Sequence, residues 1–375
     1  MRILIVNYLE TLESGGINKA VREIAYNISL KGHEVIVFNP ARSKKDEMMV
    51  TNINDNFRIV RGYRGYIYGL NLRNIGLVAR IIEEFKPQII HVHGYHSLFS
   101  TTIMMLKRVY RVRIPIVFSP HFDIERSTLA GRYLWGIYNK IIGKEIFQLA
   151  DHIIVHSRYE FAAIKHFFNV DQSKITIIPH GVDIIDPRKN RKPKDTINLL
   201  YVGYLIKRKG VDHVIRALHS LIYEYNVKNV HLKIIGKGPE KNKLVKLATK
   251  LGVNGKITWI DPLPYKDLIN ELKNADVLLL LSSSEAYGII VAEALALGTP
   301  VVVTRRTALI EFLGENSCFG VEYPPNPSTV AKTILDIIEN YDNLKVYPVR
   351  IRGWREIAEK YLRVYFRIIM HNTDY

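Results

Sequence analysis

Short apolar runs alternate along the first half of the chain with amphipathic stretches. The runs are typical of strands buried on both faces of a sheet, and the amphipathic stretches are typical of helices that cover a sheet. Strands are predicted at 2–7, 34–38, 89–92, 115–119 and 152–156, with helices at 17–30, 77–85, 98–110 and 131–149. This alternation predicts a doubly wound α/β domain with a parallel sheet.

A basic segment separates this series from a second one. Residues 186–195 (DPRKNRKPKD) contain two prolines and no apolar side chain, which indicates a linker. Strands are then predicted at 198–202, 231–235, 256–260, 275–281 and 301–303, with helices at 211–225, 240–251, 265–273 and 289–297. We therefore predict two Rossmann-like domains, at 1–185 and 196–353, that face each other across a cleft. A further amphipathic helix is predicted from residue 354.

Two glutamates stand out at one strand-to-helix junction in the second domain, within 284–300 (SEAYGIIVAEALALGTP). Glu285 follows a buried strand, and Glu293 lies on the apolar helix that begins after Gly288. Ligands of open α/β sheets bind at the carboxyl ends of strands, and anions bind at helix N-termini. The junction therefore predicts a site for a ligand with phosphate and hydroxyl groups. The alternative is a loop acid and an ordinary surface charge, and spacing alone leaves it open.

Composition narrows the class of protein. The chain has 375 residues, one cysteine and a formal net charge of +17. One cysteine excludes a disulfide framework and favours a reducing compartment. No apolar run reaches the roughly 20 residues that span a bilayer, and the N-terminus resembles a strand instead of a signal peptide. We expect a cytoplasmic protein, either soluble or peripheral on the cytoplasmic face of the membrane.

Basic and aromatic residues are interleaved at 56–82, where no acid occurs. Such a segment suits a membrane surface, a phosphorylated acceptor or nucleic acid, and a solvated basic face without a ligand is the alternative. No zinc-finger or RNP signature is present, so we rank an anionic acceptor or membrane above nucleic acid and expect no nucleic-acid partner.

The chain resembles the retaining glycosyltransferases of family 4, also called glycosyl transferases group 1, which have the GT-B fold. The motifs that carry the resemblance run over nearly the whole sequence: Gly15-Gly16, Gly32-His-Glu-Val35, Ile90-His-Val-His93, His121, Ile178-Pro-His-Gly-Val-Asp183, Val202-Gly-Tyr-Leu205, Lys209-Gly210, Ile235-Gly-Lys-Gly-Pro-Glu240 and Glu285 to Pro300. The last is the most specific, because it matches the E(x7)E element of the family and its trailing Gly-x-Pro-Val.

The resemblance implies roles for individual residues. Glu285 would contact the transferred sugar, Glu293 the ribose, and Lys209 the diphosphate, with His121 lining the reaction centre. His121, Glu285 and Lys209 are thus the catalytic candidates. The donor-binding set is Gly15, Gly16, Gly203, Arg208, Lys209, Gly236, Glu285, Tyr287, Gly288, Ile289, Ile290 and Glu293. In relatives the last helix, here 354–375, packs back on the first domain.

Acceptor-side candidates lie in the first domain: His93, Arg61, Arg64 and Tyr66. His91 and His93 lie on one face of their strand, and with His96 they raise the alternative of a zinc site. No acid or cysteine lies at a ligand spacing nearby, so we expect no metal and no cofactor.

Three positions depart from the family pattern. Tyr204 replaces an arginine, so half of the usual cationic pair is missing, and Arg208 could compensate. His180 replaces an asparagine, and Thr307-Ala308 replaces a glycine pair.

The expected activity is metal-independent transfer of a hexose (mannose, glucose or N-acetylhexosamine type) from a UDP-, GDP- or ADP-linked sugar, with retention at the anomeric carbon. The acceptor would be a glycan, a lipid-linked sugar or a sugar phosphate. The alternatives within this fold are a nucleotide-sugar 2-epimerase and a sugar phosphorylase. An alternative of another class is an inactive basic protein that binds nucleic acid or membranes.

Overall fold

The computed structural model describes residues 1–9, 15–65, 70–109, 113–123, 136, 138–183, 195–344 and 350–373. The chain forms two compact units. The first unit comprises Met1–Gly181 and Gly353–Tyr375, and the second comprises Val182–Arg352. Nearly all of the predicted linker, at 186–194, lies outside the described residues.

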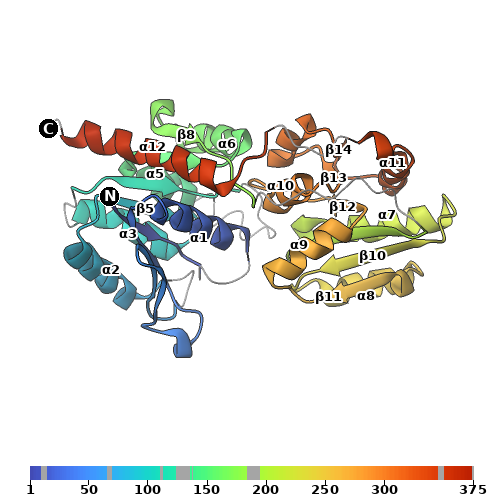
Figure 1. Cartoon of the computed structure of the whole chain (residues 1–375), viewed down its shortest axis with the longest axis horizontal. Coiled ribbons are helices and arrows are strands. Elements are labelled where there is room, and N and C mark those ends of the chain that lie inside the picture. Colours follow the sequence, from blue (N-terminus) through green and yellow to red (C-terminus); the bar gives the residue numbers. More distant parts are fainter. Residues whose placement is uncertain are drawn as a thin grey trace. The chain divides into compact units, whose positions relative to one another are not determined.

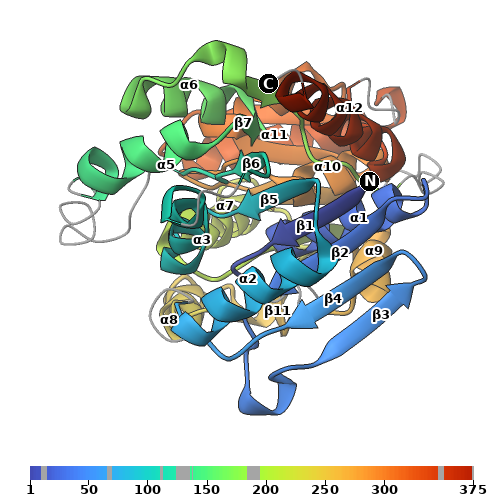
Figure 2. The same ribbon diagram turned by 90° about the vertical axis from the view of Figure 1, so that its left-hand side faces the viewer.

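An eight-stranded sheet forms the centre of the first unit, in the order β3-β4-β2-β1-β5-β6-β7-β8, and Figure 2 faces this unit. Its central strands are buried along almost their whole length because helices cover both faces. The bounds are β1 Arg2–Val6, β2 Glu34–Asn39, β3 Val50–Asn54, β4 Phe57–Arg61, β5 Ile89–His93, β6 Ile116–Ser119, β7 His152–Val155 and β8 Ile175–Ile177.

The helices of the first unit are α1 Gly16–Ser29, α2 Leu72–Phe85, α3 Leu98–Val109, α5 Lys144–Leu149, α6 Arg158–Phe168 and α12 Trp354–Thr373. The C-terminal helix α12 lies beside α1 (Figure 1). An ion pair of 2.7 Å joins Lys31, just after α1, to Glu359 on α12. The end of the chain therefore completes the first unit.

The sheet departs from the all-parallel expectation at one edge. β3 runs antiparallel to β4. β4 lies within the basic and aromatic segment 56–82, where no strand was predicted, and β3 lies just before that segment. Residues along β4 alternate between buried and less buried positions, as one-sided packing requires. The long helix expected at 131–149 is described only in part, as a π-helical turn Asn139–Gly143 that continues into α5.

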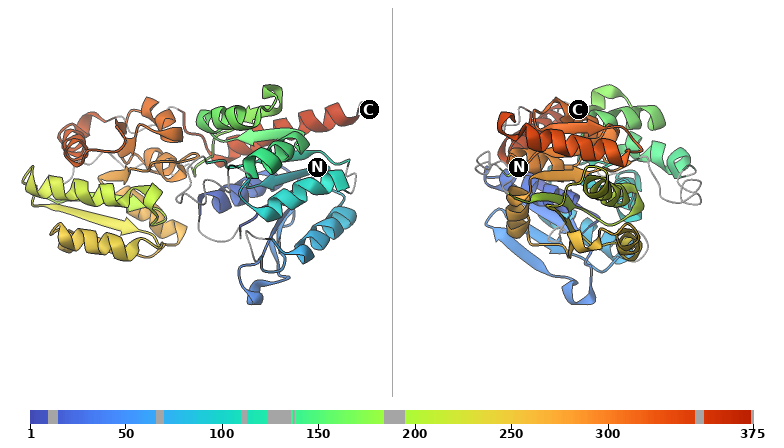
Figure 3. Two further views of the ribbon diagram at one scale, coloured as in Figure 1. Left: turned by 180° about the vertical axis from the view of Figure 1, so that it is seen from behind. Right: turned by 90° about the vertical axis from the view of Figure 1, so that its right-hand side faces the viewer.

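The second unit has a parallel six-stranded sheet in the order β11-β10-β9-β12-β13-β14. Helices α7 and α11 pack against each other (Figures 1 and 3). The strands are β9 Ile197–Val202, β10 Val230–Ile235, β11 Ile257–Ile260, β12 Val277–Leu280, β13 Val301–Thr304 and β14 Cys318–Val321, and the helices are α7 Val211–Tyr223, α8 Lys241–Lys250, α9 Tyr265–Asn274, α10 Ile289–Ala296 and α11 Pro327–Glu339.

The strand order determines which loops meet. β9 and β12 are neighbours, although some 75 residues separate them along the chain. Because the two strands are parallel, the loops that follow them emerge at the same edge of the sheet. The same argument brings together the loops after β5 and β6 in the first unit.

Candidate active site

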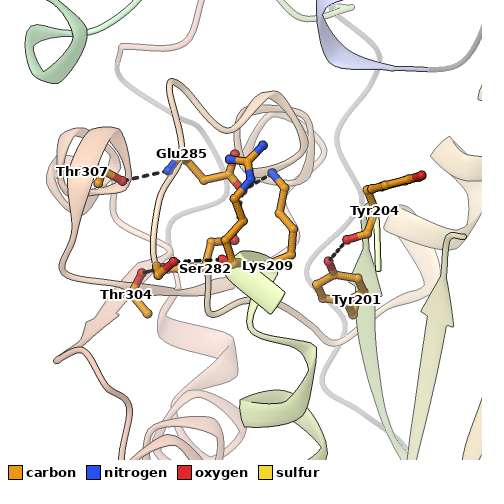
Figure 4. Close-up of polar contacts among 9 residues, drawn as sticks. Tyr201, Tyr204, Lys209, Ser282, Glu285, Thr304 and Thr307 are labelled. Atoms are coloured by element: carbon orange, nitrogen blue, oxygen red, sulfur yellow. Dashed lines mark hydrogen bonds and ion pairs between the residues drawn. The ribbon is translucent and has the colours of Figure 1, made fainter. Parts of the chain in front are cut away.

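Lys209 and Glu285 form an ion pair at the carboxyl ends of β9 and β12. Lys209 Nζ lies 2.5 Å from Glu285 Oε1, and the two side chains are 18% and 10% exposed (Figure 4). Gly210 adopts a left-handed φ of 66°, and a Cβ there would lie 2.0 Å from the carbonyl oxygen of Leu281. Only glycine allows this close approach, which sets the lysine beside the end of β12.

Glu285 is also supported by the residues that surround it. Ser282 Oγ donates to its Oε1 at 2.9 Å, and its backbone N–H donates to Thr307 Oγ1 at 3.0 Å (Figure 4). Thr304 Oγ1 in turn donates to the carbonyl oxygen of Ser282 at 2.6 Å. The carboxylate is therefore held in one orientation before any ligand arrives.

Thr307 has an unusual backbone for a β-branched residue, because its φ of 52° is left-handed. In the sequence this residue is visible only as part of the Thr307-Ala308 pair that replaces the glycine pair of the family. The Thr307 hydroxyl accepts a hydrogen bond from the Glu285 N–H. This contact explains why a threonine is present at a position whose backbone favours glycine. No sequence pattern signals this contact, because it joins two loops.

Helix α10 begins directly after Gly288, whose φ is 100°. The first intrahelical bond runs from Val291 N to the carbonyl oxygen of Gly288 at 2.9 Å. The N–H groups of Ile289 and Ile290 precede that bond, and the first turn carries no acid. These two groups and the positive end of the helix dipole suit an anion.

Glu293, on the same helix, is 5% exposed. The phenol of Tyr265, at the start of α9, lies near this carboxylate. Burial raises the pKa of the Tyr265 phenol, and the nearby carboxylates of Glu293 and Asp183 raise it further. Tyr265 is therefore a member of this site that sequence reasoning missed.

The turns after β9 and β10 approach each other through glycines. A Cβ on Gly236 would lie 1.9 Å from the carbonyl oxygen of Gly203, so the close contact requires glycine. Tyr204, which follows Gly203, is 52% exposed, and its carbonyl oxygen accepts from Tyr201 OH at 3.3 Å (Figure 4). Arg208 lies in the same 3-10 turn as Lys209.

Tyr287 lies between the two glutamates along the chain. Its ring makes an edge-to-face contact with Phe312, with centroids 5.3 Å apart. Burial raises the pKa of its phenol, with smaller contributions from Glu311 and Glu315.

In the first unit, a group of buried histidines surrounds His121, which follows β6. The other members are His91, His93, His156 and His180, and none of the five is more than 6% exposed. His121 Nε2 lies 3.0 Å from His93 Nδ1. Burial lowers the pKa of His156 to about 4 and holds the pKa of His121 well below the usual range. These rings are therefore neutral at pH 7.

The same histidines test the zinc alternative. Both ring nitrogens of His91 are engaged, with Tyr365 OH at 2.6 Å and Ser119 Oγ at 2.9 Å. A different trio, His121, His156 and His180, brings ring nitrogens within 4.8 Å of one another. Their rings are stacked, with interplanar angles of 12° to 21°.

The remaining candidates of the first domain are less closely grouped. Gly15, with φ 148°, precedes α1, which begins at Gly16. Arg61 is buried at the end of β4, and its Nη1 donates to Thr51 Oγ1 at 3.3 Å. Arg64 is exposed, and its backbone N–H donates to Glu47. Tyr66 lies outside the described residues.

Each unit thus carries its own group of candidates. Lys209, Glu285 and the start of α10 come together in the second unit, and His93 and His121 come together in the first. In the part of the chain that the structure describes, no helix is both long and apolar enough to cross a membrane.

Comparison with known proteins places these features in a family. Residues 183–349 match the family described as glycosyl transferases group 1, and residues 14–185 match glycosyltransferase family 4. The chain is 25% identical over 323 residues to a D-inositol 3-phosphate glycosyltransferase of Corynebacterium urealyticum, covering 79% of this chain and 76% of that protein.

Solved structures agree on the fold. Sucrose-phosphate synthase from Thermosynechococcus elongatus superposes with a TM-score of 0.82 at 18% identity, covering 99% of this chain and all of that one. Anabaena HepE in complex with UDP and glucose gives a TM-score of 0.69 at 16% identity, covering 100% of this chain and 98% of that one. The protein has the GT-B fold. It belongs to the group 1 (family 4) glycosyltransferases and is a hexosyltransferase.

Proposed function

We propose that the protein transfers a hexose from a nucleotide diphosphate sugar to a phosphorylated acceptor, without a metal and with retention at the anomeric carbon. The observation that carries the proposal is the ion pair of Lys209 with Glu285, beside the open N-terminus of α10. This arrangement offers a cation and backbone N–H groups to a diphosphate, and a fixed carboxylate to sugar hydroxyls.

The donor would be bound by the second unit. Lys209 and the N–H groups of Ile289 and Ile290 would neutralise the diphosphate, which is the leaving group, so that no metal is needed for its charge. Glu285 would accept hydrogen bonds from hydroxyls of the transferred sugar. Glu293, buried beside Tyr265, would accept from the ribose. HepE, whose structure was solved with UDP and glucose, supports a nucleotide-sugar donor.

Transfer would break the bond between the anomeric carbon and the diphosphate oxygen and form a bond from that carbon to the acceptor oxygen. The proton of the acceptor hydroxyl would pass to the leaving phosphate oxygen on the same face, which gives retention. His121 would line the reaction centre. Its neutral ring favours hydrogen bonding to the donor sugar over a charged interaction.

A phosphorylated acceptor is supported by two observations. The net charge of +17 favours association with anions. A relative is named as a D-inositol 3-phosphate glycosyltransferase, so an inositol phosphate or a sugar phosphate is a reasonable first acceptor to test.

The test is a matrix of UDP-, GDP- and ADP-sugars against inositol 3-phosphate, glucose 6-phosphate and their dephosphorylated forms. We expect nucleoside diphosphate release that depends on a phosphorylated acceptor, and a product that keeps the anomeric configuration of the donor by NMR. An inverted product would refute retention. Conversion of the donor without an acceptor would favour an epimerase.

A further inference from the structure

We propose that His93 and Glu160 are positioning residues that fix His121 in the conformation required for sugar transfer. The inference rests on the proposed role of His121 at the reaction centre. It adds two buried residues, one acting on the ring of His121 and the other on the adjacent backbone.

The backbone of His121 needs such support. Its φ is 49°, in the left-handed region that residues other than glycine rarely adopt. Strained residues of this kind persist only where their surroundings fix them, and they gather at functional sites. The strain therefore indicates that something nearby holds the residue in place.

Glu160 holds the backbone next to His121. Its side chain is fully buried on α6. Oε1 accepts the N–H of Phe122 at 2.6 Å, and Oε2 accepts the N–H of His156 at 2.8 Å. One carboxylate thus joins the loop after β6 to the end of β7. Burying a carboxylate is unfavourable unless hydrogen bonds compensate, and here both oxygens bond to the backbone around the site.

His93 holds the ring of His121. Their nitrogens lie 3.0 Å apart, and their ring centroids are 5.3 Å apart with an interplanar angle of 23°, as in an edge-to-edge hydrogen bond between nearly coplanar rings. His93 is 1% exposed, and its Nε2 has no hydrogen-bond partner among the residues that the structure describes. A buried N–H without an acceptor is less favourable than a buried lone pair without a donor. His93 therefore carries its proton on Nδ1 and donates to His121 Nε2, which leaves the proton of His121 on Nδ1.

The position of His93 is itself fixed by its neighbours on β5. His91, whose ring lies 4.1 Å from that of His93, bonds to Tyr365 on α12 and to Ser119 at the end of β6. The C-terminal helix thereby supports the same group of rings.

The first test is the ring state, which needs no substrate. In protein labelled with ¹⁵N-histidine, we expect the His121 signals of the Nδ1–H tautomer. In the His93→Leu variant these signals should shift or become a mixture of tautomers, whereas His93→Asn, whose amide can donate from nearly the same place, should restore them. A His121 tautomer that is unchanged in His93→Leu would overturn the proposal, whatever the activity of the enzyme.

The second test is kinetic. His93→Leu and Glu160→Gln should lower kcat roughly 10- to 100-fold with the donor KM within about twofold, because the loss is one of orientation and not of donor binding. His93→Asn should recover most of kcat. His152→Leu is the matched control, since it removes a buried histidine of the same unit that bonds to Thr176, and it should leave kcat unchanged.

The two tests separate this inference from the proposed function. A wild-type enzyme that transfers sugar while folded His93→Leu and Glu160→Gln retain full kcat would refute the positioning role alone. A wild-type enzyme with no transfer activity would refute the proposed function, and the NMR measurement would still decide whether His93 sets the tautomer of His121.

Discussion

Replacing Glu285 with glutamine should strengthen the binding of a free nucleoside diphosphate while abolishing sugar transfer. In the free protein Glu285 engages Lys209 at 2.5 Å, with both side chains largely buried. Glu285→Gln frees the lysine for the diphosphate and removes a negative charge from its vicinity. The charges that repel are the Glu285 carboxylate and the bound diphosphate. At an effective dielectric of about 20, two unit charges roughly 6 Å apart repel by about 2–3 kcal/mol. Allowing for the exposed part of the site, we expect about tenfold tighter binding, or about 1.4 kcal/mol.

Lys209→Met should act in the opposite direction. It removes a charge-assisted hydrogen bond worth about 1.5–3 kcal/mol, so binding should weaken roughly 10- to 100-fold. The double variant should fall between the two single variants, because it lacks both the attraction and the repulsion.

Isothermal titration calorimetry with UDP, GDP and ADP measures these changes directly. Glu271→Gln is the matched control, because Glu271 forms a 2.7 Å pair with Lys233 elsewhere in the same unit. This control should leave affinity unchanged. Weaker binding of every diphosphate by Glu285→Gln, together with unchanged binding by Lys209→Met, would refute the reasoning.

Three further results are expected. Glu293→Gln should weaken the binding of UDP, GDP or ADP about tenfold, since a hydrogen bond to a charged group is worth about 1.5–3 kcal/mol. The same substitution should hardly affect binding of the 2′,3′-dideoxy analogue, which lacks the ribose hydroxyls. Equal losses for both ligands would argue against ribose recognition. Thr307→Ala should lower the free energy of unfolding by about 1–2 kcal/mol because Glu285 N–H loses its acceptor. Thr307→Gly should lower it less, because a glycine adopts the left-handed φ of 52° without strain. Equal urea midpoints for the two variants would contradict this explanation. Burial lowers the pKa of His156 to about 4 and that of His91 to about 3. Below pH 6.5 the unfolded state therefore binds more protons than the folded state, and stability should be lost as pH falls from about 6.5 towards 4. A melting temperature that is constant over this range would show that these rings are not buried in the neutral form.

The elements with strong apolar patterns could be predicted from the sequence. The helix expected at 289–297 is observed at Ile289–Ala296, and the strand expected within 275–281 is observed at Val277–Leu280. Both lie in the centre of the second unit, where burial on all sides gives nearly continuous apolar runs, broken in the helix only by Glu293. The edge strand β3 was missed, because its residues are half-exposed and carry little apolar signal. No element was predicted at β4, β8, β14, α6 or α11 either.

The geometry of the site could be predicted only in part. The resemblance to the family identified Lys209 and Glu285, but their direct contact follows from the adjacency of β9 and β12, which no local pattern encodes. Thr307 was visible only as a departure from a glycine. Tyr265 and Glu160 carried no signal, because a single buried tyrosine or glutamate is recognised only when the atoms around it are known.

The most direct test of the proposed function measures the release of nucleoside diphosphate by the wild-type protein and by Glu285→Gln. The donors are a panel of UDP-, GDP- and ADP-sugars, and each is assayed with and without inositol 3-phosphate or glucose 6-phosphate. We predict that one donor releases its diphosphate at a rate that rises with a phosphorylated acceptor, and that Glu285→Gln abolishes this release while binding the free diphosphate more tightly. Full release by Glu285→Gln, or release by the wild type that does not respond to any acceptor in the panel, would contradict the proposed function.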